Sequence, residues 1–289
     1  MSATAEPDVS EFVKFWNEVL VPKFVRFKHV LVGGLSKHSE AIFPKLEVNP
    51  GERVMDAGCG FGDTACMLAE RVGPEGEVVG IDCCDGFLDY GRKEAEARRL
   101  TNIHFVEADV QTHPFQGDFD LVFSRFGTMF FENPVFALKN MRRALRPGGR
   151  MTMIVWRRSE DNPWLGAAKQ VALKHLPQPG ADAATCGPGP FSMASEELVT
   201  AQLKAAGYTD ISFERVDALV RMGDDIGDAI DFQIALGPAG EVYREAGDLA
   251  LERHDALIAD LRLLLQPHVT DDGVHMGSSS WVISARNPT

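Results

Sequence analysis

An acid and three alternating glycines form the first stretch of this sequence that could do chemistry. The segment DAGCGFG, residues 56–62, follows a short apolar run and precedes a run with helical spacing. Glycines let the backbone approach a ligand closely and adopt positive φ. Asp56, placed where a strand would end, suits a cationic ligand, because opposite charges attract strongly where solvent is partly excluded. The spacing therefore predicts a strand, a ligand-binding turn and a helix.

Dinucleotide-binding folds place glycines at the same junction, so the glycines alone leave the ligand open. The spacing here is G-x-G-x-G rather than G-x-G-x-x-G, and Asp56 would repel a bound pyrophosphate. Asp82 ends a second apolar run, at a distance from the glycines where an acid can accept two hydroxyls of a ribose. Asp82 therefore indicates a nucleoside cofactor without saying which.

Two further apolar runs end in residues that could contact a ligand. Residues 103–107 predict a third strand with Asp109 just beyond it, and dinucleotide folds have no standing need for an acid there. Residues 118–123 predict a fourth strand, which continues into the segment SRFG. Arg125 in that segment can bind an anionic substrate or form a structural ion pair, because a buried guanidinium needs a partner either way.

The ordered set DAGCGFG, GID, EAD, FSRFG and LRPGG, between about Pro50 and Trp156, resembles the class I S-adenosylmethionine-dependent methyltransferases. Within that family the chain is similar to the methyltransferase type 11 group, near the ubiquinone- and menaquinone-biosynthesis methyltransferases. The resemblance implies an α/β fold: a Rossmann-like, seven-stranded, mostly parallel sheet with helices on both faces. It also implies S-adenosyl-L-methionine as cofactor and methyl transfer as the activity.

The resemblance further implies a cofactor site built from the strand ends. Asp56 and the glycine turn would hold the amino-acid end of the cofactor, and Asp82 its ribose. Asp109, with the amide of Val110, would accept the exocyclic amine of the adenine. In full, the expected cofactor-binding residues are Asp56, Gly58, Cys59, Gly60, Gly62, Asp82, Cys83, Asp109, Val110 and Ser124.

The end of the fourth strand faces the transferable methyl in the resembled family. Enzymes that methylate amino groups of DNA bases usually carry Asn/Asp-Pro-Pro-Tyr/Phe/Trp there, and SRFG differs from that signature. This favours a small-molecule acceptor, methylated on oxygen or carbon rather than on nitrogen, with Arg125 as a candidate substrate contact. Catalytic residues stay unassigned; His38 is a candidate base only because the unperturbed pKa of histidine is near neutrality.

Five cysteines include the adjacent pair Cys83 and Cys84. Adjacent cysteines cannot easily share a tetrahedral zinc ion and form only a strained disulfide, and no second pair stands at ligand spacing. We therefore expect no metal site, and we expect this pair to pack near the ribose or adenine. An odd number of cysteines without framework spacing agrees with a reducing compartment.

Composition and charge narrow the function classes. The net charge of the 289-residue chain is -13, which argues against a general nucleic-acid binder. No stretch approaches the ~20 uncharged apolar residues that a membrane helix requires, and the first ten residues lack the pattern of a signal peptide. We therefore expect a cytoplasmic protein without membrane insertion. Its expected partner is a small-molecule methyl acceptor, and the sequence leaves the oligomeric state open.

The elements that must position the site divide the chain into four parts. Those parts are an N-terminal helical cap at 1–46, a cofactor-binding Rossmann-like core at 47–157, a Pro-, Gly- and Ala-rich loop insertion at 158–190, and the remainder of the core at 191–289. The last part is expected to contain a helical lid insertion at about 223–277. Strands at 211–216 and 281–286 should form the final antiparallel pair of the resembled fold.

Two other functions stay open at this point. A non-catalytic S-adenosylmethionine-binding or regulatory protein would keep the cofactor residues and lack a usable acceptor pocket. An NAD(P)-dependent oxidoreductase would share the strand, turn and helix and Asp82, although the glycine spacing argues against it.

Overall fold

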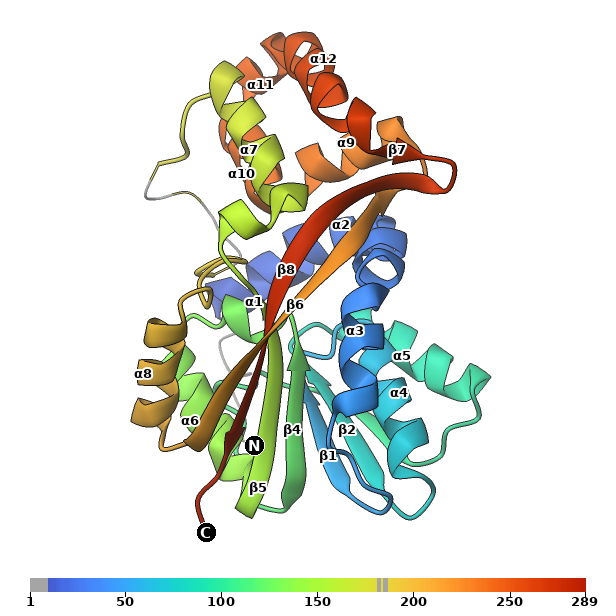
Figure 1. The fold of residues 1–289 in the computed structure, drawn as a ribbon, viewed down its shortest axis with the longest axis vertical. Helices are drawn as coiled ribbons and strands as arrows, with labels where there is room; N and C mark the ends of the chain where they lie inside the picture. The colour runs from blue at the N-terminus through green and yellow to red at the C-terminus, as the bar shows by residue number, and fades with distance from the viewer. Residues whose placement is uncertain (1–9, 181–182, 184–186) are drawn as a thin grey trace, which may run out of the picture.

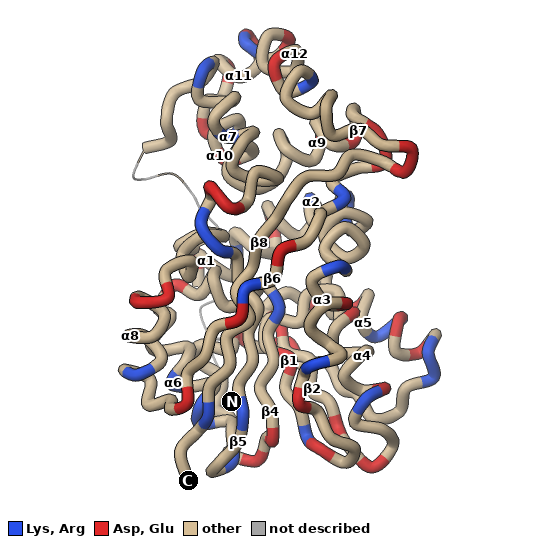
Figure 2. Tube along the Cα trace, in the orientation of Figure 1, with Lys and Arg blue, Asp and Glu red and all other residues tan. Residues whose placement is uncertain are grey.

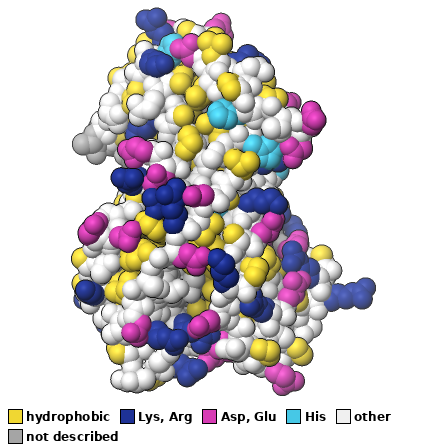
Figure 3. Space-filling view, viewed as in Figure 1, with side chains coloured by type: hydrophobic (Ala, Val, Ile, Leu, Met, Phe, Trp, Pro, Cys, Tyr) yellow, Lys and Arg dark blue, Asp and Glu magenta, His cyan; other side chains and the backbone are white. Residues whose placement is uncertain are grey.

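The computed structural model describes residues 10–180, 183 and 187–289. Figure 1 shows two lobes stacked along the long axis, with the main sheet in the lower lobe and a group of helices in the upper lobe. Acidic and basic residues are interspersed over both lobes (Figure 2). In the view of Figure 3 the molecule narrows between the lobes, and charged side chains of both signs gather at this waist.

One sheet runs through the molecule in the order β3-β2-β1-β4-β5-β8-β6, with the short strand β7 paired to β8. The strands from β3 to β5 are parallel, and β8 runs antiparallel to both β5 and β6. This confirms the predicted Rossmann-like, mostly parallel sheet. The strands are β1 (Arg53–Ala57), β2 (Glu77–Asp82), β3 (Ile103–Glu107), β4 (Phe119–Arg125), β5 (Leu145–Trp156), β6 (Thr209–Gly223), β7 (Val269–Thr270) and β8 (Gly273–Arg286).

Helices cover both sides of the parallel strands, so those strands read as short apolar runs rather than as alternating ones. α4 (Asp63–Val72) and α5 (Asp85–Ala97) flank one side in Figure 1, and α6 (Pro134–Ala144) and α8 (Glu196–Ala206) flank the other. The start of α6 follows the sequence signal, because Asn133 Oδ1 accepts a hydrogen bond from the amide of Phe136 at 3.1 Å.

The N-terminal part is helical, as expected, and lies where the parallel strands end. It consists of α1 (Glu11–Phe15), α2 (Val21–Arg26) and α3 (Ser36–Ile42), joined by π-helical segments at Trp16–Leu20 and His29–Gly34. Its apolar face is buried through residues such as Trp16, Leu20 and Phe27, each less than a tenth exposed. This burial fixes the helices over the carboxyl ends of the strands.

The expected loop insertion at 158–190 is wrong over its first half. Residues Pro163–His175 form helix α7, which buries Trp164, Leu165 and Ala168. Proline marks the start of this helix rather than a loop, because its missing N–H costs nothing at the first helical position. Part of the remaining segment lies outside the described residues.

The upper lobe is completed by four helices between β6 and β7: α9 (Ile226–Ala235), α10 (Gly237–Glu245), α11 (Asp248–Glu252) and α12 (His254–Leu265). Strands β6 and β8 extend well beyond the predicted ranges 211–216 and 281–286. The extensions pair with each other, up to Gly223 opposite Val274, after β5 has ended. This two-stranded arm carries the upper lobe. Among the described helices, none is long and apolar enough to cross a membrane.

Candidate functional site

A cavity of about 250 Å³ lies between the carboxyl ends of the parallel strands, the N-terminal helices and the upper lobe. Parallel strands present their carboxyl ends at one edge of a sheet, which is where ligands bind in open α/β folds. Most of the residues predicted from the sequence meet on its wall. Those residues are Gly58, Cys59, Gly60, Asp82, Cys83, Asp109, Val110 and Arg125.

The glycine turn has the predicted left-handed geometry, with φ of 67° at Gly58, 52° at Gly60 and 75° at Gly62. A Cβ on Gly62 would lie 2.7 Å from the Phe105 ring, so this glycine allows close packing beneath the turn. A Cβ on Gly60 would meet no atom within 4 Å, and Gly60 lines the cavity. The turn therefore has one glycine that serves packing and one that leaves bare backbone beside the cavity.

Asp82 ties the glycine turn to the end of β2. Its Oδ2 accepts a hydrogen bond from the Gly60 amide at 2.9 Å, and its Oδ1 accepts one from the Cys84 amide at 3.1 Å. Burial raises the pKa of Asp82 to about 6, and these amides oppose the rise. Each carboxylate oxygen can accept more than one hydrogen bond, so Asp82 retains capacity for hydroxyl donors from the cavity.

Asp109 lies two residues beyond Glu107, the last residue of the neighbouring strand β3. Its Oδ1 accepts a hydrogen bond from the Gln111 amide at 2.8 Å, which fixes the carboxylate in a tight turn. Val110 is held from below, because its carbonyl accepts a hydrogen bond from Asn140 Nδ2 at 2.8 Å. Two carboxylates on adjacent strand ends thus border the same cavity.

Three predicted cofactor residues, Asp56, Gly62 and Ser124, are absent from the described cavity wall. Asp56 is fully buried beneath the turn, where its Oδ2 accepts a hydrogen bond from Thr64 Oγ1 at 2.7 Å. Its Oδ1 has no hydrogen-bond partner among the described residues, and burial raises its pKa to about 7. Ser124 Oγ donates to the Ala57 carbonyl at 2.7 Å. In the structure Asp56 and Ser124 support the strands and the turn, and direct contact of Asp56, Gly62 or Ser124 with the cofactor stays a prediction.

Arg125 lies on the cavity wall and also forms an ion pair. Its Nη2 lies 2.7 Å from Asp63 Oδ2, and its Nη1 donates to Ser39 Oγ at 2.8 Å. The side chain is 8% exposed, so both interactions are screened little by water. Arg125 therefore joins β4 to α4 and the N-terminal helices, and its contact with a substrate stays a prediction.

His38 does not have the surroundings of a catalytic base. It is fully buried, with Nε2 2.7 Å from Ser278 Oγ and Nδ1 2.9 Å from Ser280 Oγ. The Ser278 hydroxyl donates to the Ala218 carbonyl at 2.7 Å, so it accepts from the histidine. Nε2 then carries the proton, and Nδ1 accepts from Ser280. Both ring nitrogens are therefore engaged by β8.

Burial, with a smaller contribution from the Arg125 charge, lowers the pKa of His38 to about 4. The rings of Phe126 and Trp156, which line the cavity, stand against the imidazole at centroid distances of 5.7 and 5.1 Å. His38 is absent from the described cavity wall. The structure does not favour a base role for His38, because both ring nitrogens are bonded to serine hydroxyls and aromatic rings stand between the imidazole and the cavity.

The apolar wall of the cavity was not predicted from the sequence. Phe126 and Trp156 stack there at a centroid distance of 3.8 Å and an interplanar angle of 13°. The other aromatic residues on the wall are Phe12, Phe15, Trp16, Phe24, Phe61, Phe87, Phe130, Phe131, Trp164 and Phe232. They come from elements far apart in the sequence, and apolar residues at helical spacing carry no signal that separates a pocket wall from a core.

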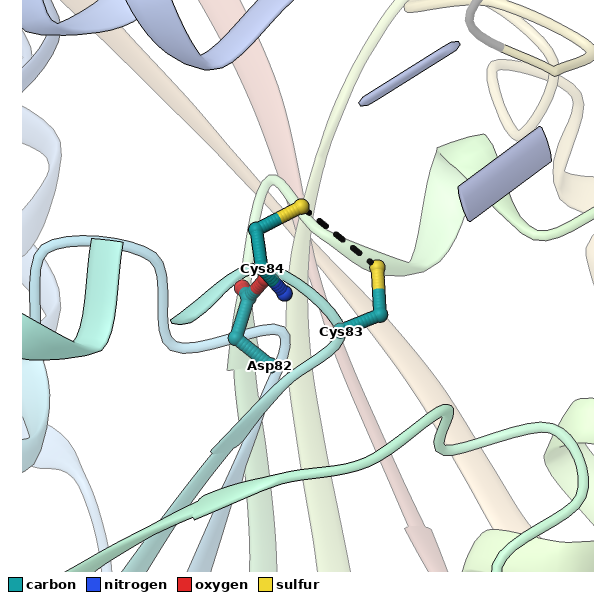
Figure 4. Close-up of side chains that lie close together, drawn as sticks. All are labelled: Asp82, Cys83 and Cys84. Carbon is teal, nitrogen blue, oxygen red and sulfur yellow. Dashed lines mark hydrogen bonds between the residues drawn. The ribbon is translucent and has the colours of Figure 1, made fainter. Parts of the chain in front are cut away.

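The adjacent cysteines have a geometry that the sequence analysis did not predict. Cys83 and Cys84 direct their sulfur atoms toward each other at 3.8 Å, beside Asp82 (Figure 4). One ligand atom from each of these three residues lies within 4.8 Å of the others. The backbone therefore brings the two thiols and the Asp82 carboxylate together, and the expectation that they bind no metal stays a prediction.

Comparisons with known proteins agree with this geometry. A family model described as a methyltransferase domain matches residues 54–149. The demethylmenaquinone methyltransferase of Geobacillus kaustophilus is 37% identical over 114 residues, which are 39% of this chain and 49% of that protein. The corresponding enzyme of Staphylococcus carnosus is 36% identical over 109 residues, 37% of this chain and 44% of that protein. The chain thus spans about half the length of these relatives or less.

Solved structures show the same fold. A candidate methyltransferase of Bacillus halodurans covers 89% of this chain and all of its own, with a TM-score of 0.56 and 18% identity. Phosphoethanolamine N-methyltransferase 2 of Haemonchus contortus, solved with S-adenosyl-L-methionine, covers 98% of this chain and 61% of its own, with a TM-score of 0.60 and 16% identity. Residues 54–149 are therefore similar to a methyltransferase domain, including that of the demethylmenaquinone methyltransferases, and the solved structures show that the fold is that of a class I methyltransferase.

Proposed function

We propose that this protein is an S-adenosylmethionine-dependent methyltransferase that acts on oxygen or carbon of an apolar small molecule. The observation that carries the proposal is a cavity with two unlike halves. Asp82 and Asp109 border it at adjacent strand ends, and aromatic rings form much of the remaining wall. The carboxylates suit a nucleoside, and the rings suit an apolar acceptor.

The residues of the site fit this cofactor better than a dinucleotide. Near the glycine turn the charged side chains on the described wall are Asp63, Asp82, Asp109 and Arg125, and Arg125 is already paired with Asp63. A diphosphate at the turn would face this acidic surplus, whereas a ligand with an ammonium and a sulfonium would be attracted to it. Asp82 would hold the ribose and Asp109 the adenine amine.

When bound, the cofactor supplies a methyl group that is already activated for displacement. The chain's own contribution is then to orient the acceptor and to exclude water. Orientation of this kind can lower a barrier by roughly 7 to 11 kcal/mol. His38 is closed off from the cavity, so we propose an acceptor that is acidic enough to react without it.

The stacked pair Phe126 and Trp156 supports a planar acceptor, because aromatic faces bind flat ligands by offset stacking. The relatives named demethylmenaquinone methyltransferases support the same class of molecule. We propose that the N-terminal helices act as a cap over this ligand and that the helical insertion α9–α12 acts as a lid, since the N-terminal helices and helices α9 and α10 contribute to the cavity wall.

We also propose a reducing, cytosolic location, which is supported by the free thiols of the described cysteines, Cys59, Cys66, Cys83 and Cys84. The acid surplus and the interspersed charges of Figure 2 support a partner other than nucleic acid.

The test is incubation of the protein with labelled S-adenosylmethionine and a cell extract divided into apolar, polar and nucleic-acid fractions. Mass spectrometry should find the label on a small molecule of the apolar fraction, and the Asp82→Ala variant should lose this transfer. Label in nucleic acid would contradict the acceptor class. Tight cofactor binding without transfer to any fraction would favour a regulatory protein, and stabilisation by NAD in place of S-adenosylhomocysteine would favour an oxidoreductase.

A further inference from the structure

Three potential metal ligands follow one another where β2 ends and α5 begins. Asp82 is the last residue of β2, Cys83 is half-buried on the cavity wall, and Cys84 is fully buried just before α5. Figure 4 shows the two sulfur atoms facing each other, with the Asp82 carboxylate beside Cys84. Consecutive residues in an extended strand point to opposite faces, so this convergence depends on the bend between β2 and α5.

The distance between the two sulfur atoms matches the one that a tetrahedral metal ion imposes. Two sulfur ligands at about 2.3 Å from a tetrahedral zinc ion stand about 3.8 Å apart. The sulfur atoms of Cys83 and Cys84 are 3.8 Å apart in the structure. A carboxylate oxygen of Asp82 lies within 4.8 Å of both, so a small rotation of its side chain would complete a set of three ligands.

We propose that Asp82, Cys83 and Cys84 form a binding site for a thiophilic divalent cation, with Zn²⁺ as the natural candidate. Two thiolates and one carboxylate are a donor set that favours zinc and other soft ions over Mg²⁺ or Ca²⁺. The fourth position would face the cavity, because Cys83 lines it. On binding, two metal–sulfur bonds form and both thiol protons pass to the solvent.

Binding of a metal ion by the two thiols should depend on pH. The thiol of Cys83 and burial raise the pKa of Cys84, and the neighbouring Asp82 carboxylate adds to the rise. A metal ion binds the thiolate form of cysteine, so binding displaces the proton of each thiol. The 13-residue helix α5 begins directly after Cys84, and a helix N-terminus favours a thiolate. Metal affinity should accordingly increase as pH rises.

A metal ion at this site would compete with the cofactor. Asp82 cannot serve as a metal ligand and also accept both ribose hydroxyls without strain in its two contacts to Gly60 and Cys84. This consequence rests on the proposed function, whereas the metal site itself does not. Zinc would then act as an inhibitor that S-adenosylhomocysteine displaces.

Equilibrium dialysis of the reduced full chain against Zn²⁺ tests the site, with Cd²⁺ as a second probe because its thiolate complexes absorb in the ultraviolet. Cys83→Ser and Cys84→Ser should each weaken binding at least tenfold and lower the cadmium–thiolate absorbance, because each removes one of the two thiolate ligands. The matched control is Cys66→Ser, which removes a buried thiol from α4 and should change neither. Thermal unfolding of each variant shows whether the fold is retained.

A second group of residues that could bind a metal ion consists of His29, Asp224 and Asp228. Zinc bound there would add to the number of zinc ions per chain, so the two groups must be tested separately. His29→Ala should leave the cadmium–thiolate absorbance intact, since that group holds no sulfur. Zinc binding that is lost in His29→Ala and kept in Cys83→Ser would overturn the proposal. Absence of cadmium–thiolate absorbance in the reduced wild-type chain would overturn it as well.

Competition separates this proposal from the proposed function. S-adenosylhomocysteine should raise the apparent Kd for Zn²⁺ in proportion to its concentration. Zinc binding at the cysteines without such competition would support the metal site and contradict the ribose role of Asp82. Binding of S-adenosylhomocysteine by a chain that binds no zinc would contradict the metal site alone.

Discussion

The two halves of the cavity are built by different means. On the sheet side, Asp82 and Asp109 stand at the ends of β2 and β3 and are held by backbone amides. On the opposite side, the N-terminal helices and the upper lobe present mainly packed aromatic and aliphatic side chains. Charge at fixed strand ends can be recognised from sequence, whereas an apolar wall resembles any hydrophobic core. The comparison teaches that the cofactor is easier to infer than the acceptor.

The largest change that we expect is a loss of folding stability on replacing a buried residue of the upper lobe. It tests whether the side chains of the upper lobe are packed as tightly as those around the sheet. Trp164→Ala should lower the free energy of unfolding by about 3 to 5 kcal/mol, because a fully buried indole leaves a cavity behind. Urea unfolding measures this change. The control is Leu263→Ala, since Leu263 is 73% exposed and its loss should change stability by about 0.5 kcal/mol or less. A small effect for Trp164→Ala would mean that α7 is loosely attached.

His38 tests the contact between the N-terminal helices and the two-stranded arm. Its pKa of about 4 in the folded chain is below the ordinary value of 6.5. The unfolded chain therefore binds a proton more readily, and stability falls as pH drops from 6.5 toward 4, by roughly 3 kcal/mol in all. Urea unfolding against pH should show a shallower fall for His38→Gln than for the wild type. Equal slopes would contradict a buried neutral imidazole.

Asp82 tests the sheet side of the cavity. Asp82→Ala should weaken S-adenosylhomocysteine binding about 100-fold, because hydrogen bonds to a charged acceptor contribute about 1.5 to 3 kcal/mol. The variant also frees the amides of Gly60 and Cys84 from their acceptor. Isothermal titration calorimetry measures the loss. Asp89→Ala, an exposed acid on α5, is the control. Unchanged affinity in Asp82→Ala would refute the ribose assignment.

Asp109 should show a smaller and more selective effect. Asp109→Ala should raise the Kd for S-adenosylhomocysteine about tenfold, which corresponds to about 1.4 kcal/mol. S-inosylhomocysteine lacks the exocyclic amine and should bind wild type and variant with nearly the same affinity. Calorimetry with both ligands forms a double-mutant cycle that isolates the amine contact. An equal loss for both ligands would assign Asp109 to the fold of the turn with Gln111 instead.

The strands, the glycine turn and the acids on the sheet side of the cavity could be predicted from the sequence, because each is indicated by residues close together in the chain. The sequence could not show that Asp56 is sealed beneath the turn while Asp82 borders the cavity, since both acids end apolar runs. It could not show that Ser278 and Ser280, some 240 residues away, occupy both nitrogens of His38. These outcomes depend on tertiary packing.

The same limit explains the errors in the upper lobe. Pro163 and its neighbours were interpreted as a loop, although proline after Asn162 begins α7. The outer parts of β6 and β8 pair only with each other, and no local pattern shows where β5 ends beside them. The aromatic wall was missed because its residues become neighbours only in the folded chain.

The most direct test of the central claim is a crystal structure of the chain with S-adenosylhomocysteine. We expect both ribose hydroxyls to lie within hydrogen-bond distance of the Asp82 carboxylate. The adenine amine should lie within hydrogen-bond distance of Asp109. A nucleoside bound away from both acids, or a diphosphate accepted at the glycine turn, would contradict the central claim.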